Sequence, residues 1–176
     1  METKINILKS FFENPHKEFY IREIARMLKI NHTTIRQHLN KLTKQGLLSL
    51  NRSKLYSAYK LNISKETLNL KLYYNLEKLR KAGLIEDLER FYDYPVIVLF
   101  GSYAQARDDE KSDVDIMIIS EINKEFNTEK YKKALNRNIS IHKFTKSSFE
   151  KLKKSNPELI NSICNGIVLS GEFEVI

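Results

Sequence analysis

Several features are scarce in this chain, and their scarcity limits what the protein can be. The only cysteine is Cys164, so no disulfide can form within the chain, and a lone cysteine of this kind is expected to be a small buried apolar residue. No apolar run approaches the roughly 18–20 residues that span a bilayer. The first residues, "METKINILKS", lack the apolar core of a signal peptide. We therefore expect a cytoplasmic protein with no membrane partner.

Acidic residues are missing from one part of the chain. No Asp or Glu occurs between Glu23 and Glu66, and nine Lys and Arg residues lie in that interval. Residues 1–62 hold twelve basic and four acidic residues, whereas residues 63–176 hold eighteen of each, so the first third carries the whole net charge of +8. This asymmetry favours a polyanionic partner for the N-terminal part. A merely solvated basic face is the alternative.

Three helical patterns and a hairpin make up the N-terminal third. The third pattern, "NHTTIRQHLNKLTKQGLL", carries Ile35, Leu39 and Leu42 as one apolar stripe, with Asn31 or Thr33 as the N-cap and Gly46 as the stop. The face opposite the stripe is rich in donors and has no acid. Such a face suits base edges and phosphates in a DNA major groove. The expected DNA-binding residues of this helix are Thr33, Thr34, Gln37, Asn40, Lys41 and Lys44.

After Gly46 the pattern changes to alternation. "LLSLNR" and "LYSAYKLN" predict two strands joined by a turn around Arg52 and Lys54, both of which are expected to reach DNA phosphates. Three helices followed by a hairpin resemble a winged helix-turn-helix domain, and "YIREIARMLKINHTTIRQHLNKLTKQGLL" is similar to archaeal and bacterial regulators of that class. The resemblance implies DNA as the partner, with a homodimer on a palindromic site as the default. A small helical domain that binds protein is the alternative.

Residues 63–92 predict a second helical region. It opens with a capping pair of Ser64 and Thr67, and a stripe of leucines, Leu72, Leu76 and Leu79, follows. Gly83 is expected to separate two helices. The region is either a connector that packs on both neighbours or a dimer-forming helix. Its tyrosines, Tyr73 and Tyr74, are expected to be packing residues.

The C-terminal half contains the chain's least ordinary motif. "YPVIVLFGS" predicts a buried strand that ends at Gly101 and Ser102, and "SDVDIMIIS" predicts a second strand with Asp113 and Asp115 on one face. Gly101 lets the backbone approach a ligand closely. Paired carboxylates repel each other, and a hard divalent cation such as Mg²⁺ (or Mn²⁺) removes that repulsion. A hairpin whose aspartates only cap a loop is the structural alternative.

Gly-Ser, ten residues and then Asp-x-Asp, framed by two apolar strands, resemble the minimal signature of the polymerase-β-like nucleotidyltransferase superfamily. The resemblance implies that Gly101 and Ser102 bind the phosphates of a nucleoside triphosphate. It also implies that Asp113 and Asp115 are catalytic and hold the metal. "NISIHKFTKSSFEKLKKSNPELINSICNGIVLSG" extends the likeness to archaeal proteins that fuse a winged helix to such a domain.

The sequence departs from the superfamily pattern in two places. The loop after Gly-Ser usually reads Ala-Arg-Gly-Glu, and here it reads Ala-Gln-Ala-Arg over residues 104–107. Active members also place a third carboxylate on the third strand, where the matching residue here is Ser140. Either His142 or a water takes over that role, or the catalytic step is weak.

We therefore predict an α+β protein in three segments: a winged helix-turn-helix domain (1–62), a helical connector (63–92) and a minimal nucleotidyltransferase domain (93–176) with a small mixed sheet. One functional hypothesis is a DNA-binding enzyme that transfers a nucleotidyl group to a hydroxyl of a protein, a small molecule or an RNA end. The other is a transcriptional regulator or antitoxin. In that case the second domain is catalytically weak or inactive, and it senses nucleotide or binds a partner such as a toxin.

Overall fold

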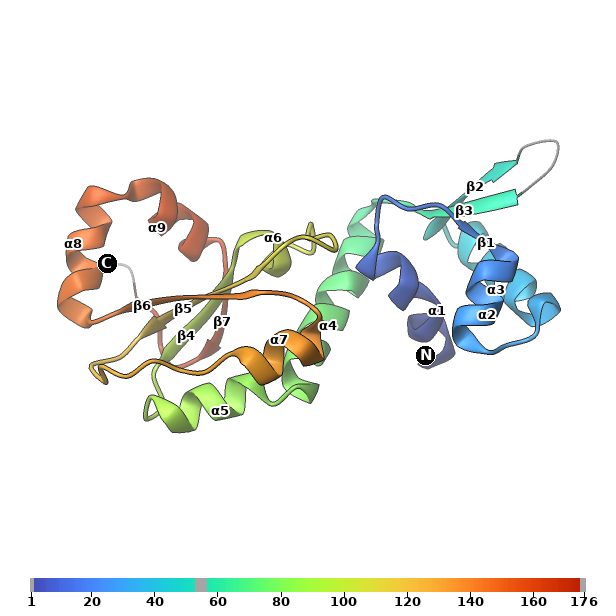
Figure 1. The fold of residues 1–176 in the computed structure, drawn as a ribbon. Helices are drawn as coiled ribbons and strands as arrows, with labels where there is room; N and C mark the ends of the chain where they lie inside the picture. The colour runs from blue at the N-terminus through green and yellow to red at the C-terminus, as the bar shows by residue number, and fades with distance from the viewer. Residues whose placement is uncertain (1, 53–56, 175–176) are drawn as a thin grey trace. The chain divides into compact units, whose positions relative to one another are not determined.

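The computed structural model describes residues 2–52 and 57–174, and the chain divides into two compact units, Met1–Tyr74 and Asn75–Ile176 (Figure 1). The first unit is helical with a small antiparallel sheet, and the second has helices around a mixed sheet. The predicted α+β class is confirmed. The division into segments 1–62, 63–92 and 93–176 stays a prediction, because helix α4 (Lys65–Lys81) begins in the first unit and ends in the second.

The first unit buries one apolar cluster among its helices and hairpin. Ile7, Leu8 and Phe11 of the first helix pack with Ile24 of the second and Leu39 of the third. Strand β1 has only two residues, too few for a sequence pattern, and it pairs with β3 to give the strand order β1-β3-β2. The elements before α4 are α1 (Glu2–Glu13), β1 (Phe19–Tyr20), α2 (Ile21–Leu28), α3 (His32–Lys44), β2 (Leu48–Arg52) and β3 (Ser57–Leu61).

Helix α3 begins and ends where its sequence predicts. The side chain of Asn31 accepts a hydrogen bond from the backbone N–H of Thr33 at 2.8 Å, so Asn31 is the N-cap. Gly46 follows the helix with φ of +73°, a conformation that glycine adopts without steric cost. The apolar stripe is buried, which leaves the opposite face of α3 toward solvent.

Helix α4 buries a row of polar residues in addition to part of the expected leucine stripe. The capping pair is confirmed, because the N–H of Ser64 donates to Oγ1 of Thr67 and the N–H of Thr67 donates to Oγ of Ser64. The leucine stripe is confirmed in part, because Leu79 is buried and Leu76 packs against the same core, whereas Leu72 is only half-buried. A polar row can be buried here because its groups have partners, as when Thr67 donates to the carbonyl of Asn62. That row, at intervals of four residues, is Thr67, Lys71 and Asn75, and the next position along it is the buried Leu79.

The two tyrosines of α4 differ from each other. Tyr74 packs its ring against Phe12 and donates its hydroxyl to Glu13, as expected of a packing residue. Tyr73 is 51% exposed, so the expectation that it packs is wrong. Its position lies between the buried rows of the helix, where the side chain points to solvent.

The second unit is built on a four-stranded sheet in the order β6-β5-β4-β7. Strand β4 is antiparallel to β5 and β7, whereas β5 and β6 run parallel. Apolar clusters cover both faces, with α5 and α7 on one side and α8 and α9 on the other (Figure 1). Helix α7 has no counterpart among the predicted elements. The elements are α5 (Leu84–Phe91), β4 (Val96–Phe100), α6 (Gly101–Ala104), β5 (Val114–Ile119), α7 (Glu129–Leu135), β6 (Ile139–Phe144), α8 (Lys146–Ser155), α9 (Pro157–Cys164) and β7 (Ile167–Ser170).

Cys164 is exposed, so the expectation of a buried cysteine is wrong. Helix α9 buries Ile160 and Ile163 against the sheet, and Cys164 is its last residue, on the flank of that buried face. Among residues 2–52 and 57–174, no helix is both long and apolar enough to span a bilayer.

Candidate functional sites

The outer face of α3 presents the side chains that the sequence singles out for DNA. All six of them are exposed, and no acidic residue lies on the helix. Asn40 differs from the others because its side-chain carbonyl accepts a hydrogen bond from the hydroxyl of Tyr59 on β3, at 3.0 Å. The structure therefore brings together Thr33, Thr34, Gln37, Asn40, Lys41 and Lys44 on one helix face.

Of the two hairpin residues predicted to contact DNA, the structure describes one. Arg52 is the last residue of β2, exposed, and paired across the hairpin with Ser57. Lys54, with the turn around it, lies outside the described residues. The roles assigned to Arg52 and Lys54 in phosphate binding remain predictions.

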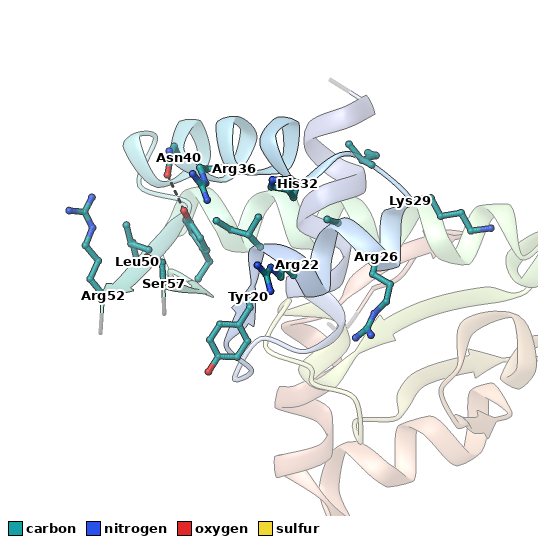
Figure 2. Close-up of a pocket in the computed structure, with 14 residues that line it drawn as sticks. Tyr20, Arg22, Arg26, Lys29, His32, Arg36, Asn40, Leu50, Arg52 and Ser57 are labelled. Carbon is teal, nitrogen blue, oxygen red and sulfur yellow. Dashed lines mark hydrogen bonds between the residues drawn. The ribbon is translucent and has the colours of Figure 1, made fainter. Parts of the chain in front are cut away.

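A groove of about 1500 Å³ lies between α2, α3 and the hairpin (Figure 2). Its lining includes basic residues that the sequence reading gave no role: Arg22, Arg26, Lys29 and Arg36. A signal was available for Arg22 and Arg26, which are spaced i and i+4 and so fall on one face of α2, and Lys29 follows directly as the C-cap of that helix. The groove also includes Arg52 and Asn40, so it adjoins the predicted DNA-reading face.

Tyr59 is another residue that lines this groove. Its side chain is only 2% exposed, and burial raises the pKa of its hydroxyl, while Arg36 and Arg52 act in the opposite direction. A phenol with the ordinary pKa of 10.0 is already protonated at neutral pH, and the upward shift moves the pKa further in that direction. Tyr59 therefore remains a hydrogen-bond donor to Asn40.

The second candidate site lies where β4 ends and β5 begins. Phe100, the last residue of β4, pairs with Asp115 of β5, which brings the carboxylate of Asp115 over the next residue, Gly101. A Cβ atom at Gly101 would lie 2.5 Å from Oδ2 of Asp115, and φ of Gly101 is +73°. The positive φ and the short distance both require glycine at position 101. The carboxylate of Asp115 therefore lies directly against the backbone of Gly101.

The two aspartates have unequal surroundings. Asp113 is exposed and immediately precedes β5, whereas Asp115 is half-buried within it. Burial raises the pKa of Asp115, the charge of Asp113 raises it further, and His142 lowers it. A carboxylate disfavoured in this way gains from a bound cation. Ser102 is half-buried in α6, one residue beyond Gly101.

Strand β6 lies beside Asp115. Ser140 is the register partner of Asp115, so the structure places a serine next to that carboxylate. Oγ of Ser140 and Nε2 of His142 are 3.1 Å apart, and Nε2 of His142 lies 4.0 Å from Oδ1 of Asp115. The ring of Phe100 packs edge-on against His142 with centroids 5.2 Å apart. The arrangement offers a hydroxyl and an imidazole beside Asp115.

No group of three or more His, Cys, Asp or Glu side chains that could hold a metal ion occurs within the described ranges 2–52 and 57–174. Mg²⁺ usually keeps several waters and takes one or two carboxylates together with substrate phosphates. Asp113 and Asp115 meet that smaller requirement.

The loop between the two motifs is held by a residue that the sequence reading missed. Nδ2 of Asn75, on α4, donates to the carbonyl of Tyr103 at 3.0 Å and to Oδ1 of Asp108 at 2.8 Å. Asn75 and Asp108 are each 1% exposed. Ala106 occupies the place of the usual glycine and still has φ of +55°. The loop thus keeps a left-handed turn without glycine, and Arg107 after it is exposed.

These two sites on these two folds define a DNA-binding unit joined to a nucleotidyltransferase unit. The family model for polymerase beta nucleotidyltransferases matches residues 83–173, more than half of the chain, and the chain belongs to that family. The model for bacterial regulatory proteins of the arsR family matches residues 1–49. The protein therefore combines an ArsR-type winged helix-turn-helix regulator domain, which binds DNA, with a polymerase-beta nucleotidyltransferase domain.

Several solved structures have some similarity to the chain, among them the following three. Reduced HlyU from Vibrio cholerae is 20% identical, with 40% of this chain and 75% of that chain covered and a TM-score of 0.35. A mutant of ZitR from Lactococcus lactis is 18% identical, with coverages of 52% and 62% and a TM-score of 0.40. PcaV, a transcriptional regulator from Streptomyces coelicolor, is 16% identical, with coverages of 53% and 70% and a TM-score of 0.38. No curated protein matches the chain.

Proposed function

We propose that the protein is a DNA-binding regulator that also binds a nucleoside triphosphate together with a divalent cation at the turn from β4 to β5. The observation that carries the nucleotide part is the close approach of Asp115 to Gly101, where any side chain would collide with the carboxylate. Glycine lets the half-buried carboxylate lie directly against the turn, so a cation held by Asp115 would be close to a phosphate bound by the backbone there.

On the DNA side, the six exposed residues of α3 would contact the major groove. Hydroxyl and amide groups, such as those of Thr34 and Gln37, suit base edges, and Lys41 and Lys44 suit phosphates. Arg52 and Lys54 of the hairpin would contact phosphates beside them. Contacts to base edges would make DNA binding sequence-selective, and contacts to phosphates would make it strongly dependent on salt.

On the nucleotide side, Asp113 and Asp115 would hold Mg²⁺ or Mn²⁺. When bound, such a cation neutralises phosphate charge and polarises the α-phosphate. Gly101 and Ser102 would position the phosphates through the backbone and the serine hydroxyl. Binding is the better supported half of this proposal, because its residues are all present in the turn.

The proposal is tested by thermal unfolding of the full chain with each nucleoside triphosphate and Mg²⁺. A nucleotide that binds only the folded protein raises the melting temperature, and Asp115→Asn should abolish that rise. Glu110→Gln removes an exposed charge from the same loop and should leave the rise intact. The nucleotide part fails if no triphosphate moves the wild-type melting temperature.

Nucleotidyl transfer is the second candidate, favoured by the pair of Asp113 and Asp115 at the start of β5. An acceptor hydroxyl oxygen would bond to the α-phosphorus, the bond to the bridging oxygen would break, and pyrophosphate would leave. The hydroxyl proton needs a base. On β6 the neighbours of Asp115 are Ser140 and His142 rather than an acid. Because no carboxylate of β6 is in place to take the proton, we expect nucleotidyl transfer to be slow.

Transfer is tested by incubating the protein and a cell lysate with α-labelled nucleoside triphosphates and Mg²⁺ or Mn²⁺. Label on a protein, an RNA or a small molecule that is lost with Asp113→Ala, but kept with Glu110→Ala, would establish the enzyme. Absence of label alongside a positive melting shift would establish a nucleotide-binding regulator instead.

A further inference from the structure

Strand β6 carries two chemically active side chains that the proposed nucleotide binding leaves unused. Ser140 is the register partner of Asp115, so β6 places a serine hydroxyl beside the carboxylate of the candidate site. His142 follows two positions later, on the same face of the strand. Ser140 is half-buried, and the side chains of His142 and Asp115 are 34% and 29% exposed. A ligand at the turn from β4 to β5 can therefore reach all three.

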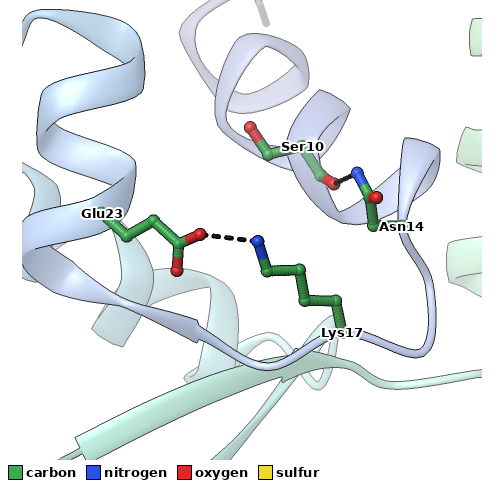
Figure 3. A network of polar contacts seen from close by, with 4 residues as sticks. All are labelled: Ser10, Asn14, Lys17 and Glu23. Carbon is green, nitrogen blue, oxygen red and sulfur yellow. Dashed lines mark hydrogen bonds and ion pairs between the residues drawn. The ribbon is translucent and has the colours of Figure 1, made fainter.

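His142 forms its hydrogen bond with Ser140 and not with Asp115. Nε2 of His142 lies 3.1 Å from Oγ of Ser140, which is within hydrogen-bond distance. The 4.0 Å from the same nitrogen to Oδ1 of Asp115 is too long for a hydrogen bond. An ion pair in direct contact is much shorter, as between Nζ of Lys17 and Oε1 of Glu23 in the first unit, at 2.7 Å (Figure 3). The imidazole is therefore paired with the serine hydroxyl.

A serine paired with an imidazole is the arrangement that makes a hydroxyl nucleophilic. In the tautomer with the ring proton on Nδ1, Nε2 of His142 accepts the hydrogen bond of Ser140 and can take its proton. No acid occurs in residues 131–145, so β6 offers no carboxylate for this role. The edge-on contact with Phe100 orients the imidazole ring. Strand β6 thus supplies both an acceptor hydroxyl and its base.

The three side chains do not form the triad of a serine hydrolase. In that triad the serine and the carboxylate lie at opposite nitrogens of the imidazole. Here both distances are to Nε2 of His142, so Asp115 does not hold Nδ1. The carboxylate of Asp115 therefore stays available to the divalent cation of the proposed site. A nucleophile beside a site for a triphosphate favours attack on phosphorus over attack on a carbonyl carbon.

We propose that Ser140 is an acceptor of the nucleotidyl group, so that the protein modifies itself. Oγ of Ser140 bonds to the α-phosphorus of the bound nucleoside triphosphate, the bond from that phosphorus to the bridging oxygen breaks, and pyrophosphate leaves. The hydroxyl proton passes to Nε2 of His142. The product is a phosphodiester that joins Ser140 to the nucleoside. This inference rests on the proposed binding of nucleotide and metal at the turn, and it names a protein acceptor for that site.

Self-modification is compatible with a site that has no acid on β6. Each chain reacts once, so a slow step is sufficient. The strand register holds the acceptor beside Asp115, which replaces a bimolecular encounter with an intramolecular one. The attached nucleotide then lies at the site. We therefore expect one nucleotidyl group per chain and no further binding of triphosphate by the modified chain.

The test uses the full chain alone with each nucleoside triphosphate and Mg²⁺ or Mn²⁺, with no other acceptor present. Trypsin cleaves after Arg137 and Lys143, and the resulting peptide, residues 138–143, contains Ser140 as its only hydroxyl residue. Mass spectrometry should show this peptide heavier by one nucleotidyl group. After removal of free nucleotide, fresh triphosphate should no longer raise the melting temperature of the modified chain.

The linkage is identified by its stability in acid. A phosphodiester on Ser140 survives mild acid, whereas a phosphoramidate on His142, which lies in the same peptide, is hydrolysed. An acid-stable adduct supports the proposal. An acid-labile adduct would make His142 the nucleophile and overturn it.

Matched serine variants locate the acceptor independently. Ser140→Ala should abolish the adduct, and Ser140→Thr, which restores a hydroxyl, should recover it. Ser170→Ala is the control, because Ser170 is a half-buried serine on β7, the opposite edge strand of the sheet, and this variant should form the adduct as the wild type does. His142→Gln should slow adduct formation by roughly 10²–10⁴-fold, the typical contribution of a general base. An adduct that persists in Ser140→Ala overturns the proposal.

Failure of this inference is distinct from failure of the proposed function. If a triphosphate raises the melting temperature of the wild type and no adduct forms, self-modification is wrong and nucleotide binding stands. If no triphosphate raises the melting temperature and no adduct forms, both are wrong.

Discussion

The two units build their sites in opposite ways. In the first unit the residues assigned to DNA are exposed, of one charge sign and spread over a helix face and a groove. In the second unit the assigned residues are few, and they depend on one another, because Asp115 lies over Gly101 and beside Ser140. A polyanion requires accumulated charge on a surface, whereas a metal and a triphosphate require a small number of groups held in place.

The difference predicts how each site responds to mutation. A single substitution on the first surface should change affinity by increments, since each phosphate contact acts separately. A single substitution at the turn of the second unit should have a larger effect, since it disturbs groups that share one position. The predictions below test this contrast from its strongest case to its weakest.

Gly101→Ala should give the largest loss. The left-handed backbone costs about 1–2 kcal/mol for a residue with a side chain, and the new Cβ at 2.5 Å from Asp115 adds roughly 1–3 kcal/mol of crowding. Chemical denaturation would measure the loss, and the nucleotide-dependent rise in melting temperature should disappear. DNA binding by the first unit should persist.

Gly83→Ala is the matched control for this prediction. Gly83 has φ of +71°, close to that of Gly101, but nothing lies within 4 Å of an added Cβ. The Gly83→Ala variant should lose only the stability that the left-handed backbone costs a residue with a side chain. If the two alanine variants lost equal stability, the close fit of Gly101 to Asp115 would not be the reason for glycine there.

Asn75→Ala should give the next largest loss. It removes two buried hydrogen bonds that hold the loop, to the carbonyl of Tyr103 and to the carboxylate of Asp108, at a cost of about 1–3 kcal/mol. Asn161→Ala, at an exposed position of α9, is the control and should change stability little. Equal effects of the two variants in denaturation would contradict a loop that depends on Asn75.

Tyr59→Phe tests whether the first unit also contains one residue that depends on another. It removes the hydroxyl that fixes Asn40, at a cost of about 0.5–1.5 kcal/mol in stability. Selection from a pool of random duplexes should then show weaker preference at one base position, by up to about 1–3 kcal/mol. Asn40→Ala should weaken the same position. A selected motif identical to that of the wild type would show that Tyr59 has no part in base reading.

The sequence predicts best the elements whose pattern is local. The stripe of Ile35, Leu39 and Leu42 determines which face of α3 is exposed, because one helix with one buried side leaves no alternative. The position of Ser140 beside Asp115 also follows from the family resemblance, and the strand register agrees with it.

The parts that the sequence does not predict depend on contacts between distant residues. The burial of Asn75 becomes understandable only with its partners in the loop, Tyr103 and Asp108, about thirty residues away. The groove combines cations of α2, α3 and β2, and no single stretch of sequence contains them all. Helix α7 has only seven residues, too few for a clear amphipathic pattern.

Substitution of Asp87 should have the smallest effect on stability. It also tests a contrast between Asp87 and Asp115 within the second unit. Nζ of Lys130 lies 2.7 Å from Asp87 Oδ2, the hydroxyl of Tyr131 donates to the same oxygen, and these contacts lower the pKa of Asp87. The pKa of Asp115 moves in the opposite direction because burial raises it. Asp87 thus contributes stability as an ion, whereas the charge of Asp115 is a cost without a cation.

The sign of the Asp87 shift sets the expected pH dependence. A carboxyl whose pKa is lower in the folded protein contributes stability above its ordinary pKa of 3.8, and this contribution is lost as the pH falls through the lowered value. Asp87→Asn should therefore lower the melting temperature slightly at neutral pH and match the wild type in strong acid. Because the pair is exposed, added salt should shrink the difference. Glu86→Gln, an exposed acid on the same helix, is the control; if its melting profile followed that of Asp87→Asn at every pH, general charge rather than the contact with Lys130 would account for the effect.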